Sequence, residues 1–284
     1  MSASLGRTGL IVSRLGLGAG PIGALAVSDG DAEAVLRAAI DCGMRVFDTA
    51  PSYGASEERI GRLFARSPHL REEVVLVTKG GYGVPGIADW TPEALTRGAA
   101  LALGRLHTDR LDVFLLHSCP PRDDLLDTLA RLKEAGLVRA VGYSGDGDGL
   151  AWAARTEAFD VLECSVNLVD QRALERDVPL AVASGKGILA KRSLANAAWD
   201  RDDHPYSARL RTAYPRPPEV PWAELAIRFA AYADGVSCAL VGTKNVERVR
   251  DAARLSEKGP LDRPREQEVR RAFAEHGASW DGVV

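Results

Sequence analysis

Short apolar runs alternate with segments of helical periodicity along the whole chain of 284 residues. The helical segments carry apolar side chains every three or four positions, as between Ala32 and Ile40. The apolar runs are shorter and mostly lack a polar face, which is typical of strands buried on both sides. Eight runs predict strands within 14–18, 44–48, 73–80, 111–117, 138–144, 159–165, 187–192 and 236–242.

The order of these segments predicts an α/β fold. Strands that are buried on both faces and separated by helices imply a parallel sheet, and eight such units indicate a closed (β/α)8 barrel. Composition does not change abruptly anywhere, so we expect a single domain over residues 1–284. We also expect a short N-terminal hairpin that turns near Thr8 and Gly9, and an extra C-terminal helix.

Several helix boundaries can be predicted from capping residues. Thr91 followed by Pro92 indicates a helix start, and Gly43 suits a helix end. Further helices are expected over 124–135, around 225–233, from Asn245 onward, and near Pro179, where we expect a break.

Two irregular stretches, 80–90 and 195–221, follow the third and seventh predicted strands. In a barrel they lie on the face that carries the active site, and long loops in a compact fold are often functional. We therefore consider Trp90 and Trp199, together with Trp280 near the C-terminus, as candidate aromatic walls of a substrate pocket.

Composition and charge narrow the function. Hydrophobic residues make up 46% and charged residues 26%, which is ordinary for a globular protein, and the net charge of −3 argues against nucleic acid as the main partner. We find no signal-peptide pattern and no membrane-spanning run, so we expect a cytoplasmic protein without a membrane partner. The cysteines, expected to be reduced core thiols, are Cys42, Cys119, Cys164 and Cys238.

Four polar residues fall at or near the carboxyl ends of the second, third and fourth predicted strands: Asp48 with Tyr53, Lys79 and His117. A tyrosine with a pKa of about 10 is a poor acid at neutral pH, and a neighbouring lysine ammonium lowers that pKa. The aspartate keeps the lysine charged, and the histidine donates a hydrogen bond to the reacting oxygen. The set is suited to protonating an oxygen while hydride reaches the adjacent carbon.

The sequence resembles the aldo-keto reductase family over nearly its whole length. The resemblance implies a (β/α)8 barrel, NAD(P)H-dependent reduction of aldehydes or ketones to alcohols without a metal, and a monomer that acts on small carbonyl substrates. It also implies a catalytic tetrad of Asp48, Tyr53, Lys79 and His117, with Tyr53 as general acid. The segments that carry the resemblance are "GMRVFDTAPSYGASEERIG", "LVTKGG", "ALGRLHTDRLDVFLLH", "VRAVGYS" and "LVGTKNVERV".

The resemblance also implies a set of cofactor-binding residues, with three departures from the usual pattern. Gly145 replaces an asparagine, Glu163 a glutamine, and Lys191 an aromatic residue that stacks on the nicotinamide. A carboxylate at Glu163 would favour the oxidised, cationic nicotinamide. The expected cofactor residues are Gly18, Ser144, Glu163, Lys191, Arg192, Gly242, Thr243, Lys244, Asn245, Arg248 and Asp251.

We predict NADPH (NADP+) as the cofactor in preference to NADH. The helix expected from Asn245 offers backbone N–H groups and a positive dipole end to phosphate. Lys244 and Arg248 lie where similar reductases hold the adenosine 2′-phosphate, and a guanidinium can bind phosphate through two hydrogen bonds. Asp251 and Ala252 replace the usual Glu-Asn pair, which implies fewer adenine contacts.

Three alternatives compete with this interpretation. "GAGPIG", from Gly18 to Gly23, matches a Rossmann glycine motif, but Pro21 interrupts it and the helical pattern starts only near Asp31. A regulatory or interaction subunit could keep the barrel and the cofactor without turnover. Metal-dependent hydrolysis would need more histidines at strand ends than His117 alone.

Overall fold

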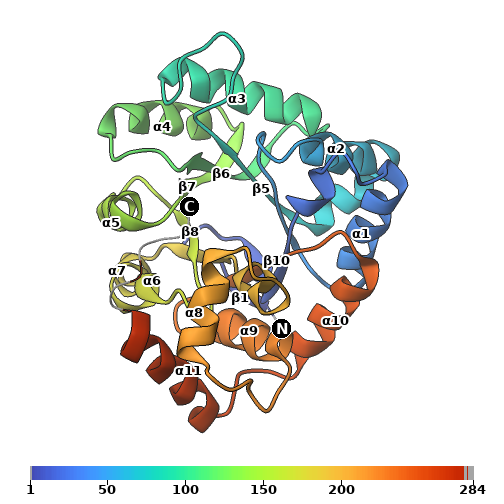
Figure 1. Ribbon diagram of the computed structural model, residues 1–284. Helices are drawn as coiled ribbons and strands as arrows, with labels where there is room; N and C mark the ends of the chain where they lie inside the picture. Colours follow the sequence, from blue (N-terminus) through green and yellow to red (C-terminus); the bar gives the residue numbers. More distant parts are fainter. Residues whose placement is uncertain (1, 278–279, 281–284) are drawn as a thin grey trace.

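Eight parallel strands close into a barrel with helices around it (Figure 1). The structure, a computed structural model, describes residues 2–277 and 280. The (β/α)8 barrel predicted from the alternating pattern is confirmed. In spatial order the strands are β10 (Cys238–Gly242), β3 (Leu15–Gly18), β4 (Val46–Asp48), β5 (Val75–Gly80), β6 (Leu111–His117), β7 (Val138–Ser144), β8 (Val161–Ser165) and β9 (Gly187–Lys191).

The predicted N-terminal hairpin is present and covers the amino end of the barrel. Strands β1 (Ser2–Ser4) and β2 (Ile11–Ser13) pair antiparallel, and the Leu5 N–H donates to Leu10 O at 2.9 Å across the turn. Apolar side chains of the hairpin pack with those inside the barrel. The Arg7 N–H donates to Gly185 O at 2.8 Å, just before β9 begins, which fixes the hairpin at that end.

The helices confirm most of the predicted boundaries. The Thr91 side chain accepts from the Ala94 N–H, as expected of an N-cap. The predicted helix break falls at Arg176, and Pro179 lies in the first turn of the next helix, where its missing N–H costs no hydrogen bond. The helices are α1 (Asp29–Asp41), α2 (Ser56–Arg66), α3 (Pro92–Arg105), α4 (Leu126–Glu134), α5 (Gly147–Arg155), α6 (Arg172–Glu175), α7 (Asp177–Ala183), α8 (Pro205–Ala213), α9 (Trp222–Tyr232), α10 (Val246–Glu257) and α11 (Arg263–His276).

The two irregular stretches differ from each other. Residues 81–90 form a loop, whereas 195–221 contain a 3-10 segment (Ala195–Asp200) and α8. The expected extra C-terminal helix is α11, which contacts α8. Within the described residues, we find no helix both long and apolar enough to cross a membrane. The four cysteines are free thiols, as predicted, and Cys42 is the one that is partly exposed.

Candidate active site

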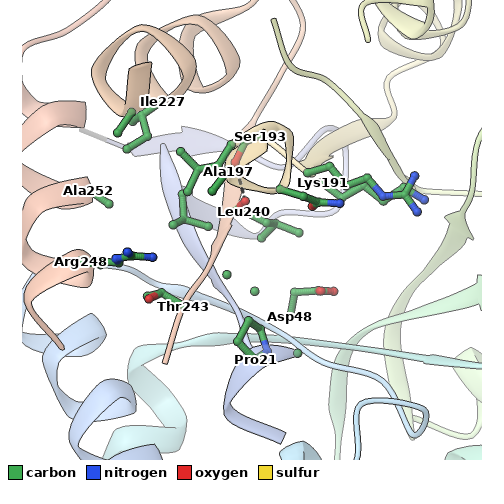
Figure 2. A pocket seen from close by; sticks show the side chains of 18 of the residues that line it. Pro21, Asp48, Lys191, Ser193, Ala197, Ile227, Leu240, Thr243, Arg248 and Ala252 are labelled. Atoms are coloured by element: carbon green, nitrogen blue, oxygen red, sulfur yellow. Dashed lines mark hydrogen bonds between the residues drawn. The ribbon is translucent and has the colours of Figure 1, made fainter. Parts of the chain in front are cut away.

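A cavity of about 710 Å³ opens at the carboxyl ends of the strands. Asp48, Tyr53 and His117 line its inner part. Figure 2 shows Asp48 and Lys191 on one side of the cavity and Arg248 and Ala252, both on α10, on the other. The cavity therefore runs from the centre of the barrel mouth towards the start of α10.

Strand register explains why residues from separate strands meet here. His117 on β6 is paired with Ser144 on β7, and Ser144 is paired with Glu163 on β8. These three side chains therefore form one row across neighbouring strands. Asp48 and Lys79 are contributed by β4 and β5, which are also neighbours in the barrel.

Lys79 is completely buried between two carboxylates. Its Nζ hydrogen-bonds to Asp48, donates to Thr49 O at 3.1 Å, and lies 3.4 Å from Glu163 Oε2. Burial lowers the pKa of Lys79, but the two carboxylates outweigh burial and raise it, so the ammonium stays charged. Burial and the neighbouring Glu163 raise the pKa of Asp48. Burial also acts to raise the pKa of Glu163, but Lys79, Lys191 and the contact with Asp48 together outweigh it and lower that pKa.

Tyr53 lies over this charged group, with Lys79 Nζ 5.1 Å from the centre of its ring. Lys79 lowers the pKa of Tyr53, as the sequence suggested. Burial and the carboxylates of Asp48 and Glu163 have the larger combined effect and raise that pKa to about 12. The effect of the lysine is therefore present but does not give a net decrease, and Tyr53 is a protonated phenol at neutral pH.

The "GAGPIG" motif, from Gly18 to Gly23, packs against the segment that contains Tyr53. A Cβ on Gly23 would lie 1.6 Å from Tyr53 O, so only glycine allows this approach. The Ala55 N–H donates to Gly23 O at 3.0 Å, which holds the two segments together. The motif itself ends in a 3-10 turn, Pro21–Gly23, and α1 begins only at Asp29, so a Rossmann arrangement is excluded.

His117 is a neutral imidazole beside Tyr53. Burial, followed by the charge of Lys79, lowers the pKa of His117 to about 3. The two rings meet edge to face, with centroids 6.2 Å apart. On the other side, Tyr82 Oη lies 3.0 Å from His117 Nδ1. Sequence reasoning missed Tyr82, for which the available signal was an aromatic residue among glycines just after a strand end.

Most of the expected cofactor residues lie along the cavity. Lys244 and Asn245 lie outside its lining, so their contact with a cofactor stays a prediction. The Asn245 side chain caps α10 and accepts the N–H groups of Glu247 and Arg248 at 2.8 and 3.2 Å. Two backbone donors that we expected to be available to phosphate are therefore already bonded. The expected residues that do line the cavity are Gly18, Ser144, Glu163, Lys191, Arg192, Gly242, Thr243, Arg248 and Asp251.

The departures at Glu163 and Lys191 produce an unusual charge arrangement. Glu163 Oε1 accepts from Ser144 Oγ at 3.0 Å, while Oε2 accepts no hydrogen bond within the described residues. Lys191 forms an ion pair with Asp146 at 3.2 Å. Glu163 Oε2 is ion-paired with Lys79 at 3.4 Å but makes no hydrogen bond in the part of the chain that the structure describes, so it can still accept from a ligand that brings an N–H group, such as the carboxamide of a nicotinamide.

The segment after β9 supplies cavity residues that the sequence analysis did not name. Of the three candidate tryptophans, Trp199 lines the cavity, whereas Trp280 packs on Phe273 with ring centroids 6.1 Å apart. Trp90 Nε1 donates to His117 O at 3.4 Å. The lining residues found only in the structure include Gly20, Pro21, Ser118, Ser193, Leu194, Asn196, Ala197, Asp200, Arg201, Ala223, Ile227 and Leu240.

Comparison with known proteins supports this class of site. The sequence model of the Aldo/keto reductase family matches residues 14–272. The chain is 32% identical over 260 residues to D-threo-aldose 1-dehydrogenase of a Pseudomonas species, across 78% of this chain and 77% of that protein. It is 29% identical over 243 residues to the NADH-specific methylglyoxal reductase of Escherichia coli, across 74% of this chain and 73% of that protein. An aldo-keto reductase structure from Bacillus halodurans has a TM-score of 0.81 at 22% identity, covering 95% of each chain.

The chain therefore belongs to the aldo/keto reductase family. It is an oxidoreductase of the NAD(P)H-dependent class, as the sequence predicted, and the regulatory-subunit alternative is not favoured. Within the described part of the chain, no cluster of three metal-ligating side chains is present.

Proposed function

We propose that this protein reduces small aldehydes or ketones to alcohols with hydride from NADPH, and that Tyr53 is the general acid. The observation that carries the proposal is the convergence of Tyr53, His117 and the buried Lys79 with Asp48 at one cavity. These are the groups needed to hold a carbonyl oxygen and to protonate it.

Each of the four residues has a distinct task in this proposal. Tyr53 holds the proton that the substrate oxygen receives, and its high pKa keeps the phenol protonated between turnovers. Lys79 offsets part of the effect of burial on Tyr53, and Asp48 holds Lys79 in place. Neutral His117 donates a hydrogen bond that orients the carbonyl oxygen.

The nicotinamide, when bound, supplies the hydride. Glu163 and Ser144 would hold its carboxamide, because the unbonded Glu163 Oε2 accepts an amide N–H. Thr243 and Arg248 would bind the other half of the dinucleotide at the far side of the cavity (Figure 2). The remaining polar and small residues that line the cavity, Gly18, Lys191, Arg192, Gly242 and Asp251, would complete the site.

The preference for NADPH rests on Arg248. Its guanidinium faces the cavity from the first turn of α10 (Figure 2). Because Asn245 already bonds two N–H groups of that turn, a 2′-phosphate would depend more on this side chain than on the backbone. Asp251 is paired with Arg254, which also supports a limited role in binding adenine.

A comparison of kcat/KM for NADPH and NADH tests this preference. In Arg248→Ala the loss should fall on NADPH alone and amount to about 1.5–3 kcal/mol, the scale of a hydrogen bond to a charged group. Arg250→Ala, which removes an exposed guanidinium of the same helix paired with Glu247, is the matched control. Equal use of both cofactors by the wild type, or an equal loss for both, would contradict the assignment.

The substrate class is tested by cofactor consumption with a panel of carbonyl compounds. Relatives are named for an aldose and for methylglyoxal, so the panel should contain aldoses, small dicarbonyls and simple aldehydes. We expect turnover of at least one aldehyde or ketone. Tight cofactor binding without oxidation of NADPH or NADH by any compound would support the binding-subunit alternative.

A further inference from the structure

The geometry points to Tyr82 as a positioning residue, which sets the tautomer of His117 so that Nε2 carries the proton. This inference rests on the proposed function, in which His117 donates a hydrogen bond to the substrate oxygen. Tyr82 acts through His117 and has no assigned contact with the substrate.

Tyr82 is well placed to bind one nitrogen of the His117 ring. Its Oη lies 3.0 Å from His117 Nδ1, and the two rings are 5.0 Å apart with an angle of 33° between their planes. The same hydroxyl lies 3.2 Å from Ser52 Oγ. A chain of Ser52, Tyr82 and His117 therefore leads from an exposed hydroxyl to the imidazole, and Nε2 is the nitrogen left for a substrate.

The number of protons in this chain limits the possible arrangements. Burial and Lys79 keep His117 neutral, so its ring has one N–H. If Nδ1 carried the proton it would donate to Tyr82, Tyr82 would donate to Ser52 Oγ, which the same distance allows, and Nε2 would present a lone pair to the cavity. If Ser52 donates to Tyr82 and Tyr82 donates to Nδ1, the proton is on Nε2. A carbonyl oxygen is an acceptor, so only the second arrangement allows His117 to bind it.

The loop that carries Tyr82 is held against His117 by several contacts. The Trp90 N–H donates to Gly81 O and closes the loop, and the Gly83 N–H donates to Asp89 Oδ1 at 2.9 Å. Gly81 has a φ of 120°, a conformation that favours glycine, and a Cβ added there would lie 3.1 Å from Trp90 Cδ1. Because Trp90 Nε1 also donates to His117 O, the loop contacts both the backbone and the ring of His117.

The tautomer can be measured directly by NMR. In protein labelled with ¹⁵N-histidine, without cofactor and at neutral pH, His117 should show a protonated Nε2 and an unprotonated, hydrogen-bonded Nδ1. The five histidines are distinguished by comparison with a His117→Asn sample. Tyr82→Phe keeps the ring but removes the donor, so the population of the Nδ1–H form should increase.

Activity provides the second readout. Tyr82→Phe should lower kcat for carbonyl reduction about tenfold, the effect of one lost hydrogen bond, with cofactor binding unchanged. Ser52→Ala should give a smaller loss, and Ser52→Thr, which restores a hydroxyl, should recover it. Tyr232→Phe is the matched control, because Tyr232 Oη donates to Ser256 O on α10, away from the cavity lining.

The outcomes separate this inference from the proposed function. A wild-type His117 protonated on Nδ1, or the same tautomer distribution in wild type and Tyr82→Phe, would overturn the role of Tyr82 even if kcat falls. Absence of reductase activity in a wild-type protein that shows the expected tautomer would instead contradict the proposed function. Retention of the wild-type kcat in Tyr82→Phe would also overturn the inference.

Discussion

At the scale of single residues, the centre of the site is one lysine shared by two buried carboxylates. Lys79 lies between Asp48 and Glu163, and Tyr53 is affected by all three charges. Glu163 supplies a second carboxylate, which a glutamine at this position would not. Its negative charge adds to the effect of burial and helps raise the pKa of the phenol to about 12.

Glu163→Gln is therefore expected to shift the pH dependence of reduction. Tyr53 must be protonated to act as an acid, so activity is lost as pH rises through its pKa. Removing a negative charge near the phenol lowers that pKa, and the alkaline decline of kcat/KM should move to lower pH. The direct measurement is the tyrosinate absorbance of Tyr53, obtained as a difference from the corresponding Tyr53→Phe protein.

Glu72→Gln serves as the control, because Glu72 is an exposed acid in the 3-10 segment that precedes β5, whereas Lys79 lies at the carboxyl end of that strand. Glu72→Gln should leave the alkaline decline of kcat/KM and the tyrosinate absorbance change of Tyr53 at the same pH as in the wild type. If Glu163→Gln titrates at the same pH as the wild type, the charge of Glu163 does not act on Tyr53.

At the scale of elements, one arginine of α2 holds the loop that precedes α1. Arg59 is buried and donates to the carbonyl oxygens of Ile22, Ala24 and Val27, and it pairs with Asp29 at 2.9 Å. These contacts tie the loop to the helix that follows Tyr53. Loop and helix thus form a common support for the segment that carries the proposed acid.

Arg59→Met should lower the free energy of unfolding by about 2–4 kcal/mol, since two buried carbonyl oxygens and one partly buried carbonyl oxygen lose a charged donor. Arg62→Met is the matched control: Arg62 pairs with the same Asp29 but is exposed, and its loss should cost no more than about 1 kcal/mol. Chemical denaturation of both variants measures the difference. A similar loss of unfolding free energy in Arg59→Met and Arg62→Met would show that the hydrogen bonds from Arg59 to the loop contribute little to stability.

A second element carries backbone strain next to the cavity. Ala195, Asn196 and Ala197 follow one another in the left-handed region, with φ values of 47°, 54° and 52°. Asparagine tolerates this conformation, but alanine is destabilised in it by about 1–2 kcal/mol. The strain lies in the segment between β9 and α8, beside the cavity.

Ala197→Gly is expected to raise the free energy of unfolding by up to about 1 kcal/mol, because relief of strain exceeds the entropy cost of glycine. Ala208→Gly, at an exposed position in α8, should lower it by about 1 kcal/mol, since its backbone is helical. Denaturation midpoints that move in the same direction for both variants would argue against a left-handed turn at Ala197.

At the scale of the whole molecule, the barrel itself could be predicted from the sequence, because apolar runs and helical periodicity are local patterns. Strand order then places Asp48, Lys79 and His117 at one end without further information. The net effect on the pKa of Tyr53 could not be predicted, since it depends on burial and on the distance to Glu163.

Two other features depend on three-dimensional contacts that the sequence does not display. The cap formed by Asn245 competes with the phosphate site expected at the same helix start, and both uses fit the same residues. The contact of Tyr82 with His117 joins positions 35 residues apart, through a loop that has no periodic pattern.

The central claim is that Tyr53 protonates the carbonyl oxygen as hydride is transferred, and single-turnover kinetics test it most directly. The protein is saturated with NADPH, mixed with the best aldehyde of the panel, and followed by the loss of reduced-cofactor absorbance. Tyr53→Phe should bind NADPH with unchanged affinity and transfer hydride at least about 100-fold more slowly, the lower range for a general acid. Hydride transfer at a rate near that of the wild type would contradict the account.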